Sequence, residues 1–377
     1  MNFACTQENL LQGLSLVGHI TGKNANLPIL NNVLLKTEDG NLKLCTTNLE
    51  MAISALVRGR VEEQGEYTVP AKLLMDYIGL LPAGKVELVV HEDTLEVRAD
   101  GKVTKIKGMP ASEFPLIPKL TKDTGYRVDA EALRQAIGQV AFAVSMSESR
   151  PELSGVACFF QGEGAVDQLV MAATDSYRLS ERMTKLATGG TAGPAKCIVP
   201  ARAIQEVARV LSSYKDDVNV PEQVEWSIAE SQFVLTYGNV ELISRLIEGS
   251  FPDYKQIIPT QFRSTCVVDR GELSRAIRAA SLFSKQGLYD VHVELTTDGV
   301  MTISSADTGT GAHTTRIPVE VQGDPNKVTL NFKYVSDGLS SIPSGKVNFK
   351  MIDGMNPVVL SPAEGEGFQY VVMPIRQ

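Results

Sequence analysis

Features that would direct a chain to a membrane or an oxidising compartment are missing from this sequence. It has no run of eighteen or more apolar residues, so a transmembrane helix is not expected. The first residues lack the basic and then apolar pattern of a signal peptide. The cysteines are odd in number, far apart and each set in an apolar stretch: Cys5, Cys45, Cys158, Cys197 and Cys266. These features predict buried, reduced thiols in a cytoplasmic protein.

Motifs for catalysis, nucleotide binding and metal binding are also missing. Neither the phosphate-binding pattern G-x-x-x-x-G-K-[ST] nor the nucleophile pattern G-x-S-x-G occurs. The histidines are scattered rather than paired at a metal-ligand spacing: His19, His91, His292 and His313. We therefore expect no catalytic residue, metal or cofactor. An enzyme whose site carries no familiar motif stays open as an alternative.

Two patterns that could suggest chemistry fit turns better. The stretch Gly309-Thr310-Gly311 follows a predicted strand, as part of a nucleotide loop would, but no opening helix comes after it. Asp175 and Asp307 could be read as a carboxylate pair, yet each ends a strand at a place where the first third of the chain has Asn48. Asn and Asp side chains bond nearby backbone in tight turns. The sequence therefore predicts turns at the Gly309-Thr310-Gly311 stretch and at Asn48, Asp175 and Asp307.

Length and charge leave several classes of partner open. The 377 residues are more than one hydrophobic core usually organises, which indicates two or three domains. Hydrophobic residues make up 43% and charged residues 21%, as in ordinary globular proteins. The net charge of −8 argues weakly against nucleic acid as a partner. A ring or cleft can still be acidic outside and basic inside, so the placement of Lys and Arg decides.

One pattern of helix and strands occurs three times along the chain. Helices are predicted to begin at Thr6, Asp129 and Asp269, each a residue that can cap exposed backbone N–H groups. Alternating strands follow each helix, and equivalent strands end at Asn48, Asp175 and Asp307, which are 127 and 132 residues apart. Such a repeat is the strongest organising signal in the sequence.

A second helix and closing hairpins complete each repeat. Val69-Pro70-Ala71 matches Val199-Pro200-Ala201, and the third repeat has residues 330–339 at the same place. Glu113-Phe114-Pro115 and Ser250-Phe251-Pro252 precede polar stretches, near 119–126 and 256–264, that are candidate linkers. We predict an α+β fold of three similar domains, 1–122, 127–255 and 262–377, each with two helices packed on antiparallel sheets.

Three equal domains also suggest how the chain assembles. Equal domains in one chain tend to pack edge to edge along an arc, and two arcs related by a two-fold axis close a ring of six domains. Sheets that continue across each boundary would remove exposed edge strands.

The residues in view resemble the bacterial sliding clamps, the beta subunits of DNA polymerase III, from end to end. The most specific parts are four: Leu27-Pro28-Ile29-Leu30 with Asn48-Leu49-Glu50-Met51, the run from Ala172 to Leu179, Phe251-Pro252-Asp253-Tyr254, and the C-terminal run from Tyr370 to Arg376. The resemblance implies a head-to-tail homodimeric ring through which duplex DNA runs, without catalysis. It also implies a separate ATP-driven clamp loader, and one pocket per subunit, between the second and third domains, for short motifs of the loader, polymerases and repair proteins.

By matching position to the family, a set of mostly apolar residues is expected to form this partner-peptide pocket. They are Leu153, Thr174, Ser176, Tyr177, Arg178, Leu179, Pro252, Ile257, Asn331, Tyr334, Met355, Pro357, Val371, Met373, Pro374 and Arg376. A groove of Leu, Val, Met and Pro suits an aliphatic or aromatic peptide anchor. Ser176-Tyr177 replaces the small residue and histidine common in the family, and Gln377 replaces an apolar residue, so the peptide preference stays open.

Basic residues on the predicted helices and loops are expected to face DNA. They are Lys23, Lys72, Arg150, Arg202, Arg209, Arg275, Arg278, Lys285 and Lys333. Long cations facing a channel contact phosphates without reading bases, which permits sliding. The alternative is ordinary solvated surface charge.

The dimer edge is expected to join Thr104 and Ile106 of one copy to Leu282 and Phe283 of the other. Phe283 is a plausible apolar anchor there. The family often has an aromatic residue at the position of Thr104, so a weaker contact is expected. A peptide-binding scaffold that has lost ring closure and works off DNA therefore stays open as a second alternative.

Overall fold

The computed structural model describes residues 1–22, 27–117, 125–147, 149–161, 167–187, 193–214, 221–229, 231–285 and 287–376. Two compact units divide the chain. Unit 1 comprises residues 1–131, 187–192 and 206–246, and unit 2 comprises residues 132–186, 193–205 and 247–377. No helix among the described residues is long and apolar enough to cross a membrane.

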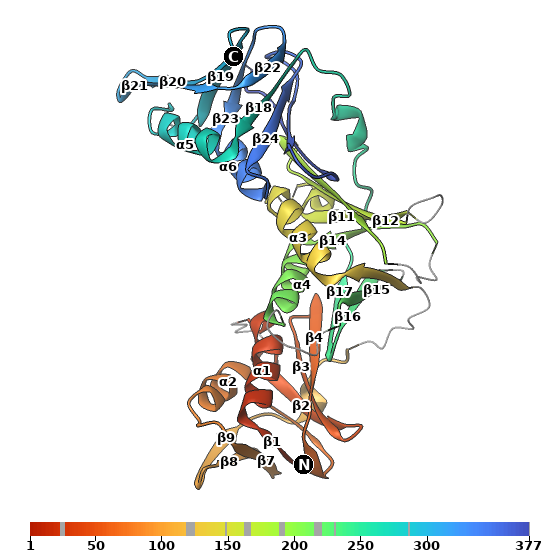
Figure 1. The fold of residues 1–377 in the computed structure, drawn as a ribbon. Coiled ribbons are helices and arrows are strands. Elements are labelled where there is room, and N and C mark those ends of the chain that lie inside the picture. The colour runs from red at the N-terminus through yellow and green to blue at the C-terminus, as the bar shows by residue number, and fades with distance from the viewer. Residues whose placement is uncertain are drawn as a thin grey trace. The chain divides into compact units, whose positions relative to one another are not determined.

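The three predicted repeats are present as one order of elements, a strand and a helix, then strands, a second helix and a closing meander (Figure 1). The first repeat contains β1 (Asn2–Thr6), α1 (Gln7–Val17), β2 (Asn32–Glu38), β3 (Asn41–Thr47), β4 (Met51–Val57), β5 (Arg60–Glu63), β6 (Glu66–Pro70), α2 (Ala71–Gly79), β7 (Lys85–His91), β8 (Thr94–Ala99) and β9 (Lys102–Lys107). The second contains β10 (Gly125–Asp129), α3 (Ala130–Val140), β11 (Gly155–Gln161), β12 (Gln168–Thr174), β13 (Arg178–Lys185), β14 (Ala195–Pro200), α4 (Ala201–Ser213), β15 (Gln223–Ala229), β16 (Gln232–Tyr237) and β17 (Val240–Arg245). The third contains β18 (Ser264–Asp269), α5 (Arg270–Ser281), β19 (Asp290–Thr296), β20 (Val300–Asp307), β21 (Gly311–Pro318), β22 (Glu320–Gly323), β23 (Asn326–Asn331), α6 (Phe332–Ser341), β24 (Lys346–Met351), β25 (Val358–Pro362) and β26 (Phe368–Val372).

Short-range capping sets where the helices begin, as the sequence predicts. The Thr6 hydroxyl accepts the Asn9 N–H at the start of α1, at 3.2 Å. The Asp269 carboxylate accepts the Glu272 N–H at the start of α5, at 2.8 Å. These side chains satisfy N–H groups that have no partner inside the helix. The α+β class and the three-fold repeat are therefore confirmed.

Unit 1 is built on two antiparallel sheets. Their strand orders are β5-β1-β7-β8-β9 and β10-β15-β16-β17-β4-β3-β2-β6. In the larger sheet, β17 of the second repeat pairs with β4 of the first, so one sheet contains strands of both repeats. Helix α1 packs on β3 and β4 and lies against α2 (Figure 1). The only tryptophan of the chain, Trp226 on β15, is fully buried in this unit.

Unit 2 repeats this architecture with strands of the second and third repeats. Its sheets have the orders β14-β11-β12-β13-β26-β25-β24-β18-β22 and β21-β20-β19-β23. Here β26 pairs with β13, which is the same join as β17 with β4 in unit 1. Helices α5 and α6 lie side by side (Figure 1) and close one hydrophobic core that includes Leu273, Leu339 and Tyr370.

Both candidate linkers are shorter than predicted where the structure describes them. Residues 118–124 lie outside the described residues, and Gly125 and Tyr126 already belong to β10, where they pair with Ser227 and Trp226. In the second stretch, a short 3-10 helix η6 (Tyr254–Ile257) comes first and Ser264 begins β18. The first stretch was assigned too far because β10 is an edge strand, and edge strands can be polar on their outer face. The five cysteines are all free and buried, as predicted.

Candidate partner pocket, basic faces and sheet edges

A tight turn between β12 and β13 forms the centre of the predicted partner pocket. The Thr174 hydroxyl donates to the Arg178 carbonyl at 2.6 Å and accepts the Ser176 N–H at 3.1 Å. One Asp175 carboxylate oxygen accepts the N–H groups of Tyr177 and Arg178, at 2.9 and 3.0 Å. Ser176 adopts a positive φ of 79°. The turn is thus fixed by short-range bonds, and it presents Tyr177 with 63% of its surface exposed.

The predicted turn roles of the other two strand ends are confirmed in the same way. The Asn48 side-chain oxygen accepts the N–H groups of Glu50 and Met51, at 3.1 and 2.8 Å. The Asp307 carboxylate accepts the N–H groups of Gly309 and Thr310, at 2.7 and 3.2 Å.

Arg178 is held inside this turn by carboxylates on two elements. Its guanidinium donates to Asp175 at 3.0 Å, to Asp337 of α6, and to the Phe142 carbonyl at 3.0 Å. The guanidinium carbon lies 4.8 Å from the ring centre of Tyr334. Only 11% of the side chain is exposed. A cation with this many partners positions its neighbours rather than meeting solvent.

The end of the chain is tied to the turn. Strand β26 pairs with β13, and beyond it the Met373 N–H donates to the Tyr177 carbonyl at 2.9 Å. The Ile375 N–H donates to the Thr329 carbonyl at 2.8 Å. Terminal residues are usually frayed unless bonded in this way. The structure therefore brings Met373 and the adjoining Pro374 beside the turn.

Several of the residues predicted to form the pocket are apolar and exposed. Ile257 is 44% exposed and Met355 is 60% exposed. Tyr177 stacks on Tyr334 with ring centres 6.4 Å apart. Large exposed apolar side chains around a rigid turn are typical of a surface that binds a partner.

The remaining predicted pocket residues divide into buried and partly exposed side chains. Leu153, Leu179 and Val371 are 1% exposed each, so a peptide cannot reach these side chains without a shift of the residues that cover them. Asn331 caps α6 by accepting the Lys333 N–H at 2.9 Å. The others are partly or fully exposed: Pro252, Pro357, Pro374 and Arg376.

A buried polar group beneath the turn was not predicted from the sequence. Tyr254 donates its hydroxyl proton to Glu181, which is only 5% exposed and also accepts from Gln369 at 2.6 Å. Burial, and then the bond to Glu181, raise the pKa of the Tyr254 hydroxyl, so it stays protonated as a donor. Asp337, which holds Arg178, was also missed. The Phe251-Pro252-Asp253-Tyr254 run was the one signal in the sequence that pointed to this group.

The predicted DNA-facing residues of the helices are mostly exposed. Lys72 of α2 is paired with Asp76 at 2.7 Å, and Arg202, Arg275, Arg278 and Lys285 are exposed. Lys333 of α6 lies 3.5 Å from the ring centre of Tyr289. Arg150 contacts Glu152 at 3.0 Å and the Ser176 hydroxyl at 3.3 Å, which brings it to the pocket. Lys23 lies outside the described residues.

Family models for three domains of one protein match consecutive parts of the chain. The model of the DNA polymerase III beta subunit N-terminal domain matches residues 1–118, the central-domain model 127–253 and the C-terminal-domain model 255–376. The chain belongs to the DNA polymerase III beta subunit family. It is therefore a sliding clamp, and a non-catalytic processivity factor of DNA replication.

Full-length relatives and solved structures agree with this assignment. The "Beta sliding clamp" of a Synechocystis species is 29% identical over 398 residues, covering 100% of this chain and 99% of the relative. That of Staphylococcus aureus is 27% identical over 386 residues, with the same coverage. The crystal structure of the DNA polymerase III subunit beta from Pseudomonas aeruginosa matches with a TM-score of 0.92 at 27% identity, covering 100% of both chains. That from Thermotoga maritima matches at 0.90 and 25%, covering 100% of this chain and 99% of that one.

One of the predicted DNA-facing residues of this clamp, Arg209, is bonded to other residues of unit 1. Arg209 of α4 binds Glu206 at 2.6 Å and donates to the carbonyls of Ser15 and Leu16, at the end of α1. His19 approaches the other oxygen of Glu206 at 2.7 Å. Cations at a helix C-terminus are favoured by its carbonyls and dipole. Arg209 thus has a structural role within unit 1, whatever its exposure to DNA.

Strands β9 and β21 lie at the ends of their sheets and contain or adjoin the predicted dimer residues. Ile106 is 4% exposed and packs inward, while Thr104 donates to the Tyr77 hydroxyl of α2 at 2.8 Å. Leu282 is 73% exposed, and Phe283 stacks on His313 of β21 with ring centres 5.7 Å apart. Val103 on β9 and Leu80 at the end of α2 were not predicted, although they are 58% and 83% exposed.

Proposed function

We propose that two copies of this clamp pair head to tail into a closed ring, with β9 of each copy joining β21 of the other. The observation that carries this proposal is how antiparallel meanders, such as β2-β3-β4 and β15-β16-β17, pair with each other within one sheet. In each unit the last strand of one meander pairs with the last strand of another, β17 with β4 and β26 with β13. The equivalent strands β9 and β21 occupy sheet ends. A second copy supplies the missing partner for both, and two-fold symmetry closes the ring.

Apolar side chains at both edges support this pairing. The β9 edge offers Val103, and Leu80 is exposed at the end of α2, whose Tyr77 accepts a hydrogen bond from Thr104 of β9. The β21 edge offers Leu282 and Phe283. Thr104 and Ile106 support the β9 edge from its other face. Large apolar side chains at the centre of an interface contribute most of its binding energy. Val103, Leu80 and Leu282 are exposed in one copy, so their burial by a partner favours the dimer.

The ring is proposed to encircle duplex DNA without reading its sequence. The exposed cations of α2, α4, α5 and α6 would meet phosphates inside the ring, although the chain as a whole carries a net charge of −8. Phosphate contacts position a protein on DNA but carry no sequence information, and they weaken with salt. Retention by the closed ring allows each contact to stay weak, and that permits sliding.

The pocket around Tyr177 is proposed to take short peptide motifs of the clamp loader, polymerases and repair proteins. Exposed apolar side chains, a turn fixed by hydrogen bonds and an anchored chain end support this assignment. The proposed domains are residues 1–122, 127–255 and 262–377. Because the relatives are bacterial proteins of DNA replication, the cytoplasm is the proposed compartment.

Sedimentation equilibrium over a range of concentrations tests ring closure. We expect a species of about twice 40.8 kDa. Leu282→Asp should raise the dimer dissociation constant about 100-fold, because a charge would be buried at the edge. The control Met146→Asp changes another exposed apolar residue, 94% exposed, and should leave the dimer intact. A monomer at every concentration would overturn the ring and favour the off-DNA scaffold.

Retention on DNA tests encirclement separately. The loaded dimer should stay on nicked circular DNA and leave once the circle is cut, since a linear molecule lets a ring slide off. Equal retention on both forms would show ordinary surface binding instead.

A further inference from the structure

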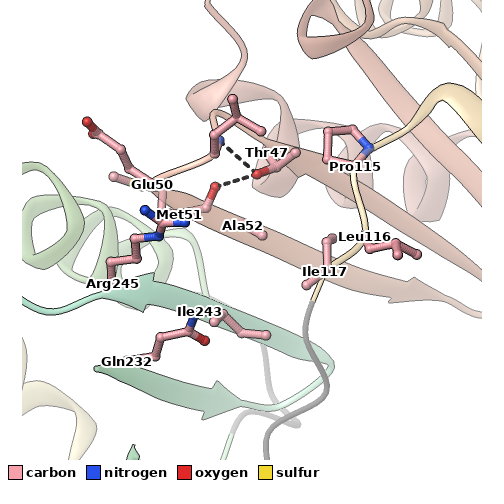
Figure 2. Close-up of a pocket in the computed structure, with 11 residues that line it drawn as sticks. Thr47, Glu50, Met51, Ala52, Pro115, Leu116, Ile117, Gln232, Ile243 and Arg245 are labelled. Carbon is pink, nitrogen blue, oxygen red and sulfur yellow. Dashed lines mark hydrogen bonds between the residues drawn. The ribbon is translucent and has the colours of Figure 1, made fainter. Parts of the chain in front are cut away.

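A cavity of about 280 Å³ lies within unit 1, beside the first residues of β4 (Figure 2). The residues that matter for its chemistry are Leu49, Met51, Pro115, Ile117, Ile243 and Arg245. Met51 and Ile243 are largely buried, at 5% and 8% exposure, and form its apolar floor. Leu49 and Arg245 are exposed at its rim.

The turn that forms one wall has the same bonds as the turn of the partner pocket. The Thr47 hydroxyl donates to the Met51 carbonyl at 2.9 Å and accepts the Leu49 N–H at 3.1 Å (Figure 2). Thr174 makes the same two bonds in unit 2. Leu49 has a φ of 75°, close to the 79° of Ser176. The two turns are therefore copies of one structure.

The other two walls are also copies. The Arg245 N–H donates to the Glu50 carbonyl at 3.0 Å, just as the Met373 N–H donates to the Tyr177 carbonyl at 2.9 Å. Arg245 therefore occupies the position of Met373. Pro115 follows Phe114 as Pro252 follows Phe251, and both phenylalanines pack in the cluster beneath their cavity or turn.

Side chains at these walls give the cavity its own chemistry. Arg245 forms no ion pair with any residue that the structure describes, and the Glu50 carboxylate points away from the cavity (Figure 2). The Gln232 side-chain oxygen is buried at the wall and accepts no hydrogen bond within the described residues. An apolar floor beside an available cation matches an extended peptide with aliphatic and acidic side chains.

We propose that this unit 1 cavity is a second peptide-binding site, which takes a short extended segment with an aliphatic anchor beside a carboxylate. The anchor lies on Met51 and Ile243, and the carboxylate pairs with Arg245. Leu49 supports the assignment, because a leucine held at positive φ with 49% exposure is unfavourable in both backbone and solvation unless a partner covers it. The proposal goes beyond the proposed partner pocket, which serves only as its geometric template.

Methyl NMR of the intact dimer tests the site. Isoleucine δ1 and methionine ε methyl groups are labelled, and Ile243→Val, Met51→Leu and Met373→Leu variants assign the three reporter signals. The probe is the acetylated, amidated peptide DELLE, and the comparison peptide is KKLLK. We expect DELLE to shift the Ile243 and Met51 signals with half-saturation below about 1 mM. Arg245→Gln should weaken this binding at least about fivefold, whereas the matched control Arg60→Gln in the same unit should not.

The outcomes separate this inference from the proposed function. Shifts of Met373 alone would leave the partner pocket supported and overturn the second site. Shifts of Ile243 and Met51 that persist in Arg245→Gln, or that KKLLK produces equally, would also overturn it, because the charge pairing would then be absent. Saturable shifts of Ile243 and Met51 that depend on Arg245 support it, whether or not Met373 responds.

Discussion

The same turn occurs in both units of the molecule, at residues 47–51 and 174–178, and its surroundings differ. The bonds between the threonine hydroxyl and the backbone are matched one for one, and both turns hold a non-glycine residue at positive φ. In unit 2 a cation, Arg178, is enclosed by two carboxylates within the turn. In unit 1 the residue equivalent to Arg178 is the buried Met51. A cation, Arg245, lies instead at the rim of the unit 1 cavity.

This difference shows that the residues which form the turn are not the residues which would bind a partner. A threonine followed by Asn or Asp provides all the side-chain bonds that the turn needs, so both copies keep those residues. The residues after them are free to differ. Unit 2 places its charge where it orders the turn and exposes aromatic side chains. Unit 1 has the apolar Met51 at the position of Arg178, and its exposed cation, Arg245, lies at the rim of the cavity.

The largest expected effect comes from giving the unit 2 turn the unit 1 residue, Arg178→Met. Two carboxylates, Asp175 and Asp337, lose their common partner, and Asp175 is only 16% exposed. We expect the local free energy of opening to fall by about 2–3 kcal/mol. Hydrogen exchange of the β13 and β26 amides measures it.

The control for this substitution is Arg263→Met in the same unit. Arg263 pairs with Asp324 at 3.0 Å, but both side chains are 62% exposed. Solvent screening should keep its effect below about 1 kcal/mol. Equal effects of the two substitutions would mean that Arg178 does not order the turn.

A smaller and equal effect is expected when each turn loses its threonine hydroxyl. Thr47 and Thr174 are both 5% exposed, and Thr47→Val and Thr174→Val each leave one partly buried N–H, that of Leu49 or Ser176, without its acceptor. Each should cost about 1–2 kcal/mol, within about 0.5 kcal/mol of the other. Hydrogen exchange of β4 and β13 gives both values in one experiment. Thr265→Val on β18 is the control, and a difference between the turns above about 1 kcal/mol would show that they are not copies.

The architecture was predictable because it depends on short-range signals. Thr6 and Asp269 cap their helices, and Asn48 and Asp175 close their turns, with partners three residues away. Such patterns are visible in a single sequence and recur with the repeat. Most of the strand order within each repeat follows from short connections between antiparallel neighbours.

The contacts that complete the sites join residues too far apart in the chain for such patterns. Arg178 meets Asp337 across 159 residues, and Tyr254 meets Glu181 across 73. Arg209 was expected to face DNA because it lies two turns from Arg202, but its guanidinium reaches the end of α1, 193 residues away. Nothing in spacing along one helix shows what another element brings beside it. The sequence did not predict the unit 1 cavity for the same reason, because its walls come from three distant segments.

The smallest effect tests the strain in the unit 1 turn, through Leu49→Gly. Glycine adopts positive φ without the steric cost that leucine has there, about 1–2 kcal/mol, but it loses more conformational entropy on folding. The net result should be stabilisation by about 0.5–1 kcal/mol. Urea unfolding followed by the fluorescence of Trp226, which is buried in unit 1, measures it. Leu49→Ala keeps the backbone cost and should give no such gain. Destabilisation by both variants would mean that the exposed leucine already packs within the folded chain, and it would remove one support for a ligand there.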